Sequence, residues 1–268
     1  MKPLATQTGV GGYRLPTSRI RSFVPNGLAA LLLMWPCMFL PATALGSAEP
    51  PAFSDEPNAA GLPAGWLPFN PSAKAKPTRY ALVRDGDAMV VRADANASMS
   101  GLIHPLRVDL AETPLIQWRW RIERPLRTAD MTTKAGDDYA ARLYVLFDYD
   151  VARLSFLTRT KLKLARTLYG VEVPAAALNY VWDNRQPVGT IQANAYTDRS
   201  RMVVLESGAD KAGLWVTETR DLAADFRAAF GEDAPPVTGI AIATDTDNTG
   251  ERVTAWYGDI RFLKRGRP

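Results

Sequence analysis

The chain has 268 residues, of which 47% are hydrophobic and 22% charged, so it can bury a core as one large domain or two small ones. Its net charge of +4 comes from the N-terminus: residues 1–48 hold four of the 32 basic residues and no acid, which leaves 28 basic and 28 acidic residues. This balance disfavours nucleic-acid binding, which requires a basic excess.

The N-terminal residues have the pattern of a secretory signal. An apolar run at 27–40 follows Arg19 and Arg21 and precedes small residues that end at Ala48. The run is shorter than the roughly 20 residues of a membrane-spanning helix. We expect cleavage after Ala48, with Ala44 as the alternative, and export to the periplasm or beyond with no membrane span after cleavage. A retained N-terminal anchor is the other interpretation.

Cysteine and histidine are nearly absent. Cys37 lies in the signal segment, so the mature chain has no disulfide, thiolate metal site or cysteine nucleophile. His104 is the single histidine, which excludes multi-histidine zinc sites. Residues 49–63, rich in proline, alanine and acidic residues, predict a flexible lead-in. Residues 64–268 are expected to form one domain.

Short runs with period-two alternation follow. Residues 79–83 and 88–93 flank Asp85-Gly86, a strong hairpin signal. Residues 115–123 send Trp118 and Trp120 to an apolar face and Arg119 and Arg121 to the opposite face. Residues 139–149 alternate similarly. Further strands are expected at 177–182, 189–195, 201–206, 214–219, 238–244 and 252–263.

Two segments have helical spacing instead. Residues 152–169 place Leu154, Leu157, Leu164 and Leu168 at helical spacing with basic residues between them, and residues 221–230 precede Gly231, a natural helix stop. About ten strands and two helices predict an all-β, jelly-roll-like β-sandwich of two sheets with one or two short helices inserted. The basic helix either covers a sheet or lies on an anionic membrane.

Several stretches resemble a known family. The sequences PLIQWRW at 114–120, GDDYAAR at 136–142, LNYVW at 178–182 and TDTDNTG at 244–250 are similar to domain-of-unknown-function family 3047, a family of exported bacterial proteins. The resemblance implies export and a single domain, but no catalytic role. The final stretch WYGDIRF at 256–262 is similar to the closing strand of jelly-roll carbohydrate-binding modules, which implies aromatic stacking on sugars and a structural calcium.

The Gly-Asp-Asp turn is the first candidate binding site. Asp137 and Asp138 enter a strand on which Asp138 and Arg142 share a face, so a carboxylate and a guanidinium are available for hydroxyls or an anion. The alternative is a turn cap with a surface ion pair.

Trp182 is the second candidate. Asn179 precedes it and Asp183 follows it, and an aromatic wall with convergent polar groups suits a polyhydroxylated ligand. For Trp118 and Trp120, core packing is expected instead. Arg119 and Arg121 suit an acidic sugar or a phosphate, or belong to a solvated sheet face.

The acidic loop at 244–250 is the third candidate. Asp245, Asp247 and Asn248 offer closely spaced oxygens that suit calcium, although the spacing is not that of an EF-hand. A structural turn is the alternative.

Catalytic motifs are not specific. No G-x-S-x-G elbow accompanies His104, so a serine triad has no support. A glycosidase needs two carboxylates about 5–10 Å apart, for which Asp138, Asp148, Asp183, Glu206 and Glu218 are all conceivable and none is singled out.

The hypothesis that follows is an exported module that binds a carbohydrate or cell-envelope glycan. The first alternative is a structural envelope protein that contacts a membrane or a protein partner. The second is a carboxylate-based glycan hydrolase or lyase. Binding without turnover is favoured over enzymatic activity.

Overall fold

The computed structural model describes residues 49–57, 61–70, 75–156, 158–160 and 175–266. The secretory signal expected over residues 1–48 lies outside the described residues, as does most of the helix expected over 152–169. Within the described part, no helix combines the length and the apolar character that a membrane crossing requires.

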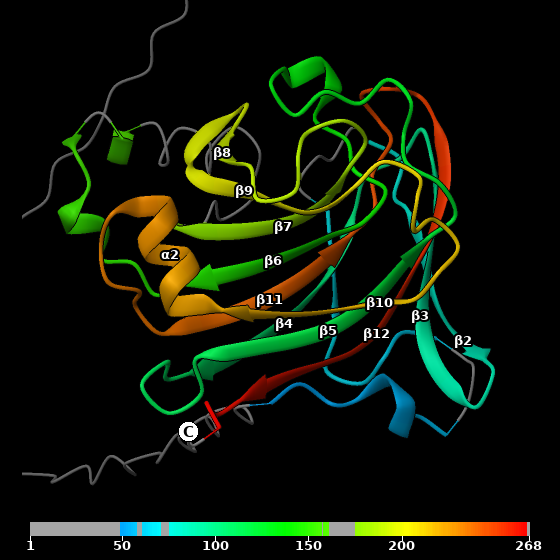
Figure 1. Cartoon of the computed structure of the whole chain (residues 1–268), viewed down its shortest axis with the longest axis horizontal. Coiled ribbons are helices and arrows are strands. Elements are labelled where there is room, and N and C mark those ends of the chain that lie inside the picture. The colour runs from blue at the N-terminus through cyan, green and yellow to red at the C-terminus, as the bar shows by residue number, and fades with distance from the viewer. Residues whose placement is uncertain (1–48, 58–60, 71–74, 157, 161–174, 267–268) are drawn as a thin grey trace, which may run out of the picture. The chain divides into compact units, whose positions relative to one another are not determined.

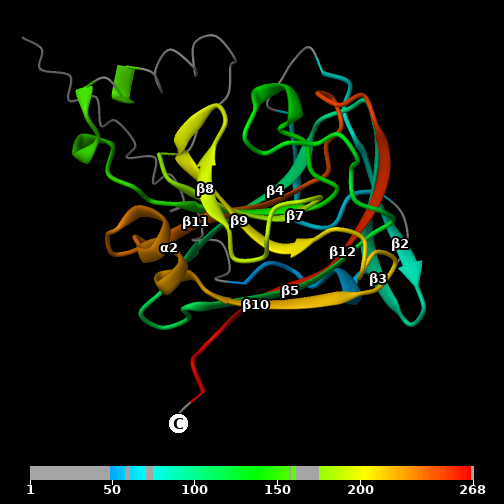
Figure 2. The ribbon, with the colours of Figure 1, turned by 45° about the horizontal axis from the view of Figure 1, so that its top comes forward.

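The described strands form two sheets, which appear as two layers in Figures 1 and 2. The seven-stranded sheet has the order β1 (Leu67–Phe69), β4 (Gly101–Val108), β11 (Val237–Ala243), β6 (Arg142–Phe147), β7 (Ala177–Asp183), β9 (Thr197–Ser207) and β8 (Ile191–Asn194). The five-stranded sheet has the order β10 (Val216–Asp221), β5 (Leu115–Ile122), β12 (Arg252–Leu263), β3 (Ala88–Asn96) and β2 (Arg79–Asp85). Neighbouring strands are antiparallel except β7 and β9. The expected all-β, two-sheet, jelly-roll-like sandwich is confirmed.

The sheets pack through a core of large aromatic side chains. Along β5 every second residue is buried, as the period-two pattern predicts, and the arginines between them face outward. Trp118 lies 5.2 Å from Tyr180 of β7, and Trp120 lies 6.0 Å from Trp182, between ring centroids. The core therefore joins one strand of each sheet, and its aromatic burial is a main contribution to stability.

Helix α2 (Leu222–Phe230) confirms the second helical prediction. The Asp221 carboxylate accepts from the backbone N–H of Ala224 at 3.1 Å, which caps the first turn. Gly231 ends the helix with φ 76°, a left-handed conformation that favours glycine.

Two strands were not predicted from the sequence. Strands β1 and β4 lie at one edge of the seven-stranded sheet. Pro105 lies within β4, opposite Gly239, where the register of β11 shifts. A proline removes one ladder N–H, and a bulge in the partner strand accommodates that loss.

Part of the expected flexible lead-in packs against the domain. The 3-10 turn η1 (Phe53–Asp55) buries Phe53, whose ring lies 5.3 Å from that of Trp66. Ser54 donates from its backbone N–H and its hydroxyl to Asp259 of β12, at 2.9 and 2.6 Å. A single buried phenylalanine in a segment without periodicity gives little sequence signal for such docking.

Candidate functional site

The predicted Asp–Arg site lies at the start of β6, beside the end of β11. Arg142 is 2% exposed and forms an ion pair with Asp245, which is fully buried. The same aspartate accepts from the backbone N–H of Tyr139 at 3.2 Å. The Arg142 guanidinium also lies 4.9 and 5.2 Å from the ring centroids of Tyr139 and Tyr144. The arginine therefore has its partners inside the protein.

Asp138 and Asp137 connect neighbouring loops. The Asp138 carboxylate accepts from the side-chain amide of Asn248 at 3.1 Å and from the backbone N–H of Thr249 at 2.6 Å. The Asp137 carboxylate accepts from the Asn194 amide at 2.9 and 3.0 Å. The structure thus brings the Gly-Asp-Asp turn and the acidic loop together, although they are distant in the sequence, and adds Asn194, which no sequence motif indicated.

The combined cluster is strongly acidic. Asp138, Asp245 and Asp247 each place a carboxylate oxygen within 4.8 Å of the others. Burial raises the pKa of Asp245, and the Arg142 charge opposes this shift. Burial, and then the Asp138 charge, raises the pKa of Asp247. The carboxylate oxygens suit a hard cation such as calcium, while the hydrogen bonds of Asp138 equally suit a structural turn.

Trp182 differs from the expected exposed platform. Its side chain is 2% exposed, and its indole N–H donates to the Gly208 carbonyl at 3.1 Å. All seven residues of β7 are buried, because a second apolar cluster covers the other side of this strand. That cluster consists of Met131, Tyr139, Val181, Met202 and Val204. In this structure Trp182 therefore offers no ring face to a ligand.

The two polar neighbours of Trp182 are also buried. The Asn179 amide lies against the Met202 sulfur at 3.3 Å. The Asp183 carboxylate accepts from the backbone N–H groups of Arg185 and Gln186 at 2.7 and 2.6 Å, which closes the turn after β7. The hydrogen bonds of Asp183 serve a turn, and its carboxylate does not converge with the Trp182 ring on an open surface.

A different surface combines aromatic and polar groups: the outer face of the five-stranded sheet. The Arg119 guanidinium lies 4.6 Å from the ring centroid of Trp215, and that of Arg121 lies 4.9 Å from Trp215 and 4.3 Å from Trp256. Asp85 accepts from Arg121 at 3.1 Å and from the Trp215 indole at 2.7 Å. We call Arg119, Trp215, Arg121 and Trp256 the Arg–Trp ladder. The sequence indicated its arginines, but the tryptophans come from β12 and from the residue before β10, which only the sheet order brings alongside β5.

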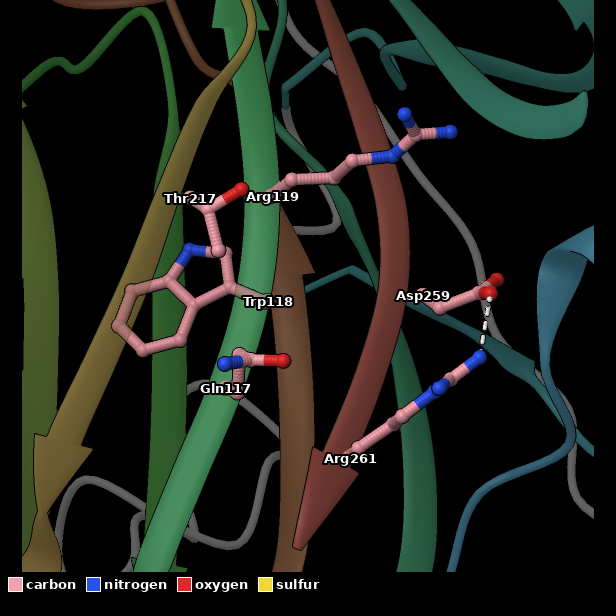
Figure 3. A pocket seen from close by; sticks show the side chains of 6 residues that line it. All are labelled: Gln117, Trp118, Arg119, Thr217, Asp259 and Arg261. Carbon is pink, nitrogen blue, oxygen red and sulfur yellow. Dashed lines mark hydrogen bonds and ion pairs between the residues drawn. The ribbon is translucent and has the colours of Figure 1, made fainter.

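A cavity of about 200 Å³ adjoins the ladder (Figure 3). It is lined by Gln117, Trp118, Arg119, Thr217, Asp259 and Arg261. Gly258 makes room for Arg119, since a Cβ at this position would lie 2.5 Å from both Cγ and Nε of the arginine. A glycine at 258 therefore leaves room for the Arg119 side chain, which crosses β12 in Figure 3.

One pair of the candidate catalytic carboxylates comes together. Glu206 of β9 and Glu218 of β10 approach each other from different sheets, and burial followed by the Glu206 charge raises the pKa of Glu218 to about 7. Lys211 forms an ion pair with Glu206 at 2.7 Å. By contrast, Asp148 lies in an exposed ion pair with Arg107.

Comparison with known families agrees with the motifs. A family model described as a protein of unknown function (DUF3047) matches residues 64–261. The chain belongs to this family. A comparison with curated protein sequences gave no match.

Solved structures give distant similarities to this DUF3047 member. A family 12 xyloglucanase from Bacillus licheniformis has 8% identity and a TM-score of 0.43, and the alignment covers 77% of this chain and 95% of the xyloglucanase. A family 30 carbohydrate-binding module from Clostridium thermocellum has 11% identity and a TM-score of 0.36, with coverage of 75% of this chain and 95% of the module.

The described surfaces thus differ in what they offer a ligand. Arg142, Trp182 and the carboxylates of Asp137, Asp138 and Asp245 are buried and have their partners within the protein. The Arg–Trp ladder is only half-buried and lies beside a cavity with polar lining. Aromatic surface together with a few fixed polar groups is the usual composition of a small-molecule site.

Proposed function

We propose that the protein is an exported carbohydrate-binding module whose ligand lies on the outer face of the five-stranded sheet. The observation that carries this proposal is the Arg–Trp ladder beside the cavity of Figure 3. Sugars present both apolar C–H faces and hydroxyl groups, so aromatic surface and nearby hydrogen-bonding groups complement them.

The polar groups of this face are held in place before a ligand arrives. Asp85 fixes both Arg121 and Trp215, and the Gln117 amide donates to the Thr219 hydroxyl at 3.0 Å. Stacking on the tryptophans further restricts the arginine side chains. Binding then loses less side-chain entropy, which favours affinity for a weakly interacting ligand such as a sugar.

A glycan array and affinity electrophoresis with soluble polysaccharides test the proposal. We expect saturable binding that falls at least tenfold when Trp215→Ala and Trp256→Ala are combined. Tyr196→Ala is the control, because this tyrosine is 57% exposed but lies in the turn between β8 and β9 of the other sheet. A blank array, or equal loss in both variants, would contradict the proposal.

The carboxylate pair favours a second candidate, a glycan hydrolase. Glycoside hydrolysis uses one protonated and one ionised carboxyl group. A pKa of about 7 for Glu218 supplies the protonated group near neutral pH, and Glu206, in an ion pair with Lys211, lies beside it. The same polysaccharides distinguish the candidates, because a hydrolase releases reducing ends during incubation and a binding module retains its ligand intact.

A further inference from the structure

We propose that the ligand of this face is an anionic glycan, with Arg119 and Arg261 holding its acidic groups at the cavity. This inference rests on the proposed function and adds the class of sugar. The Arg–Trp ladder and the cavity together carry three arginines, at 119, 121 and 261, and two aspartates, at 85 and 259.

The two aspartates are already engaged. Hydrogen bonding from the Trp215 indole, and then from Arg121, lowers the pKa of Asp85, so this residue stays ionised and paired with Arg121. Asp259 accepts two hydrogen bonds from Ser54 and lies 3.4 Å from Arg261. Among the described residues, Arg119 has no acidic partner within ion-pair distance. The ladder and the cavity together therefore keep one unbalanced positive charge.

Arg119 is held where a ligand can reach it. Its stem crosses β12 at Gly258, and its guanidinium stacks on Trp215 at 4.6 Å. The planar guanidinium has five N–H donors in a fixed arrangement that matches a carboxylate or a sulfate through two parallel hydrogen bonds. A hydroxyl group takes up neither the charge nor the paired geometry, so an acidic sugar gains more from this residue than a neutral one.

The size of the cavity indicates how much of the ligand it takes. A volume of about 200 Å³ lies below the roughly 300 Å³ at which pockets for whole small molecules begin. The cavity therefore suits one acidic substituent with part of its ring. The rest of a polysaccharide would lie across the sheet, along the Arg–Trp ladder. Gln117 and Thr217 at the cavity supply neutral hydrogen-bonding groups for the neighbouring hydroxyls.

A matched pair of polysaccharides tests this inference. Polygalacturonate and its fully methyl-esterified form share a backbone and differ in the free carboxylate. We expect the purified protein to bind the acid form at least tenfold more tightly, with affinity that falls as salt rises. Dextran sulfate and dextran form a second pair, which shows whether sulfate replaces the carboxylate.

Three variants assign the effect to the cavity. Arg119→Gln is expected to lose at least tenfold in affinity for the acid form while retaining the wild-type melting temperature. Arg79→Gln removes the same charge from β2 of the same sheet, where the side chain is 78% exposed, and should lose less than twofold. Gly258→Ala keeps every charge but displaces Arg119, so it should weaken binding of the acid form as well.

The outcomes separate this inference from the proposed function. Equal binding of the acid and ester forms would overturn the anionic class and leave carbohydrate binding standing. Equal losses of affinity in Arg119→Gln and Arg79→Gln would overturn the assignment to the cavity. Retention of single-stranded DNA as strong as that of polygalacturonate would show unselective binding of polyanions and would also overturn the inference. If no polysaccharide of any pair is retained, the proposed function itself is wrong.

Discussion

At the scale of single residues, the pair Glu206 and Glu218 combines two carboxyl groups, of which Glu218 has a strongly shifted pKa. The two carboxylates come from different sheets, and Lys211 is an ion-pair partner of Glu206 at 2.7 Å. Burial is the first cause that raises the pKa of Glu218 from 4.5 to about 7, and the Glu206 charge is the second. The protein therefore holds a proton at this position over a pH range in which an unfolded chain has lost it.

This proton uptake predicts a pH-dependent stability. Because the folded state binds the proton more tightly, the free energy of unfolding falls as pH rises from about 4.5 to about 7 and stays low above that range. Glu218→Gln removes the titration, so we expect it to stabilise the protein above pH 7 and to have no such effect below pH 4.5. Glu218 is partly exposed, and solvent screening reduces the expected gain to about 1 kcal/mol.

Urea unfolding of wild type and variant between pH 4 and pH 8 measures this effect. Glu112→Gln, at an exposed position after β4, is the matched control and should follow the wild-type curve. A Glu218→Gln curve that runs parallel to wild type across the whole range would show that folding does not raise the pKa of Glu218.

Single residues also show what a sequence pattern can and cannot specify. The alternation of side chains along β5 correctly predicted Trp118 and Trp120 in the core and Arg119 and Arg121 on the opposite face. The prediction for Trp182 rested instead on its polar neighbours Asn179 and Asp183, and the structure buries all three side chains. The second apolar cluster, which contains Met131 and Val204, covers the other side of β7. Its residues come from segments distant in the sequence, so no local pattern indicates it.

At the scale of elements, the acidic loop at 244–250 follows β11 and is the segment for which the sequence predicts calcium binding. Its aspartates and the Asp138 carboxylate place three carboxylate oxygens within 4.8 Å of one another, with Arg142 as the cation paired to Asp245. Like charges at this separation repel, and a divalent cation would relieve the repulsion. Calcium binding remains a prediction.

If calcium binds here, it should stabilise the folded protein. Saturating calcium is expected to raise the free energy of unfolding by about 1–3 kcal/mol, and a chelator should reverse the gain. Asp247→Asn should abolish the response, whereas Asp210→Asn, at an exposed position after β9, should leave it intact. Thermal unfolding with and without calcium is the measurement. An unchanged melting temperature would assign the loop to turn formation, with Asp138 as its hydrogen-bond acceptor.

The elements themselves were predictable where local chemistry is strong. The Asp85-Gly86 hairpin and helix α2 follow from turn and stop residues, and both form as expected. Strand β4 was missed because Pro105 and the serines before the strand argue against a strand. The bulge of β11 opposite Pro105 makes the strand possible, and such a pairing between distant residues is not visible in either segment alone.

At the scale of the whole domain, the two described sheets share one aromatic core. Trp118 contacts Trp120 within its own strand, at 5.4 Å, and Tyr180 in the other sheet, at 5.2 Å. A side chain that packs against both sheets couples their stability, because the sheets cannot separate without exposing that side chain to water. Trp215, in contrast, lies on the outer face and supports only its local neighbours.

The difference between these two tryptophans predicts how the domain unfolds. Trp118→Ala removes a fully buried side chain and should cost about 3–5 kcal/mol, with far-UV and near-UV circular dichroism lost at a single shared denaturant midpoint. Trp215→Ala should cost about 1 kcal/mol or less and keep the wild-type spectrum. Two separate transitions in Trp118→Ala would mean that the sheets unfold independently. In that case a variant of the ladder could lose ligand binding by unfolding only the five-stranded sheet. A single transition would instead mean that a ladder variant with a native spectrum lost its ligand through the binding face itself.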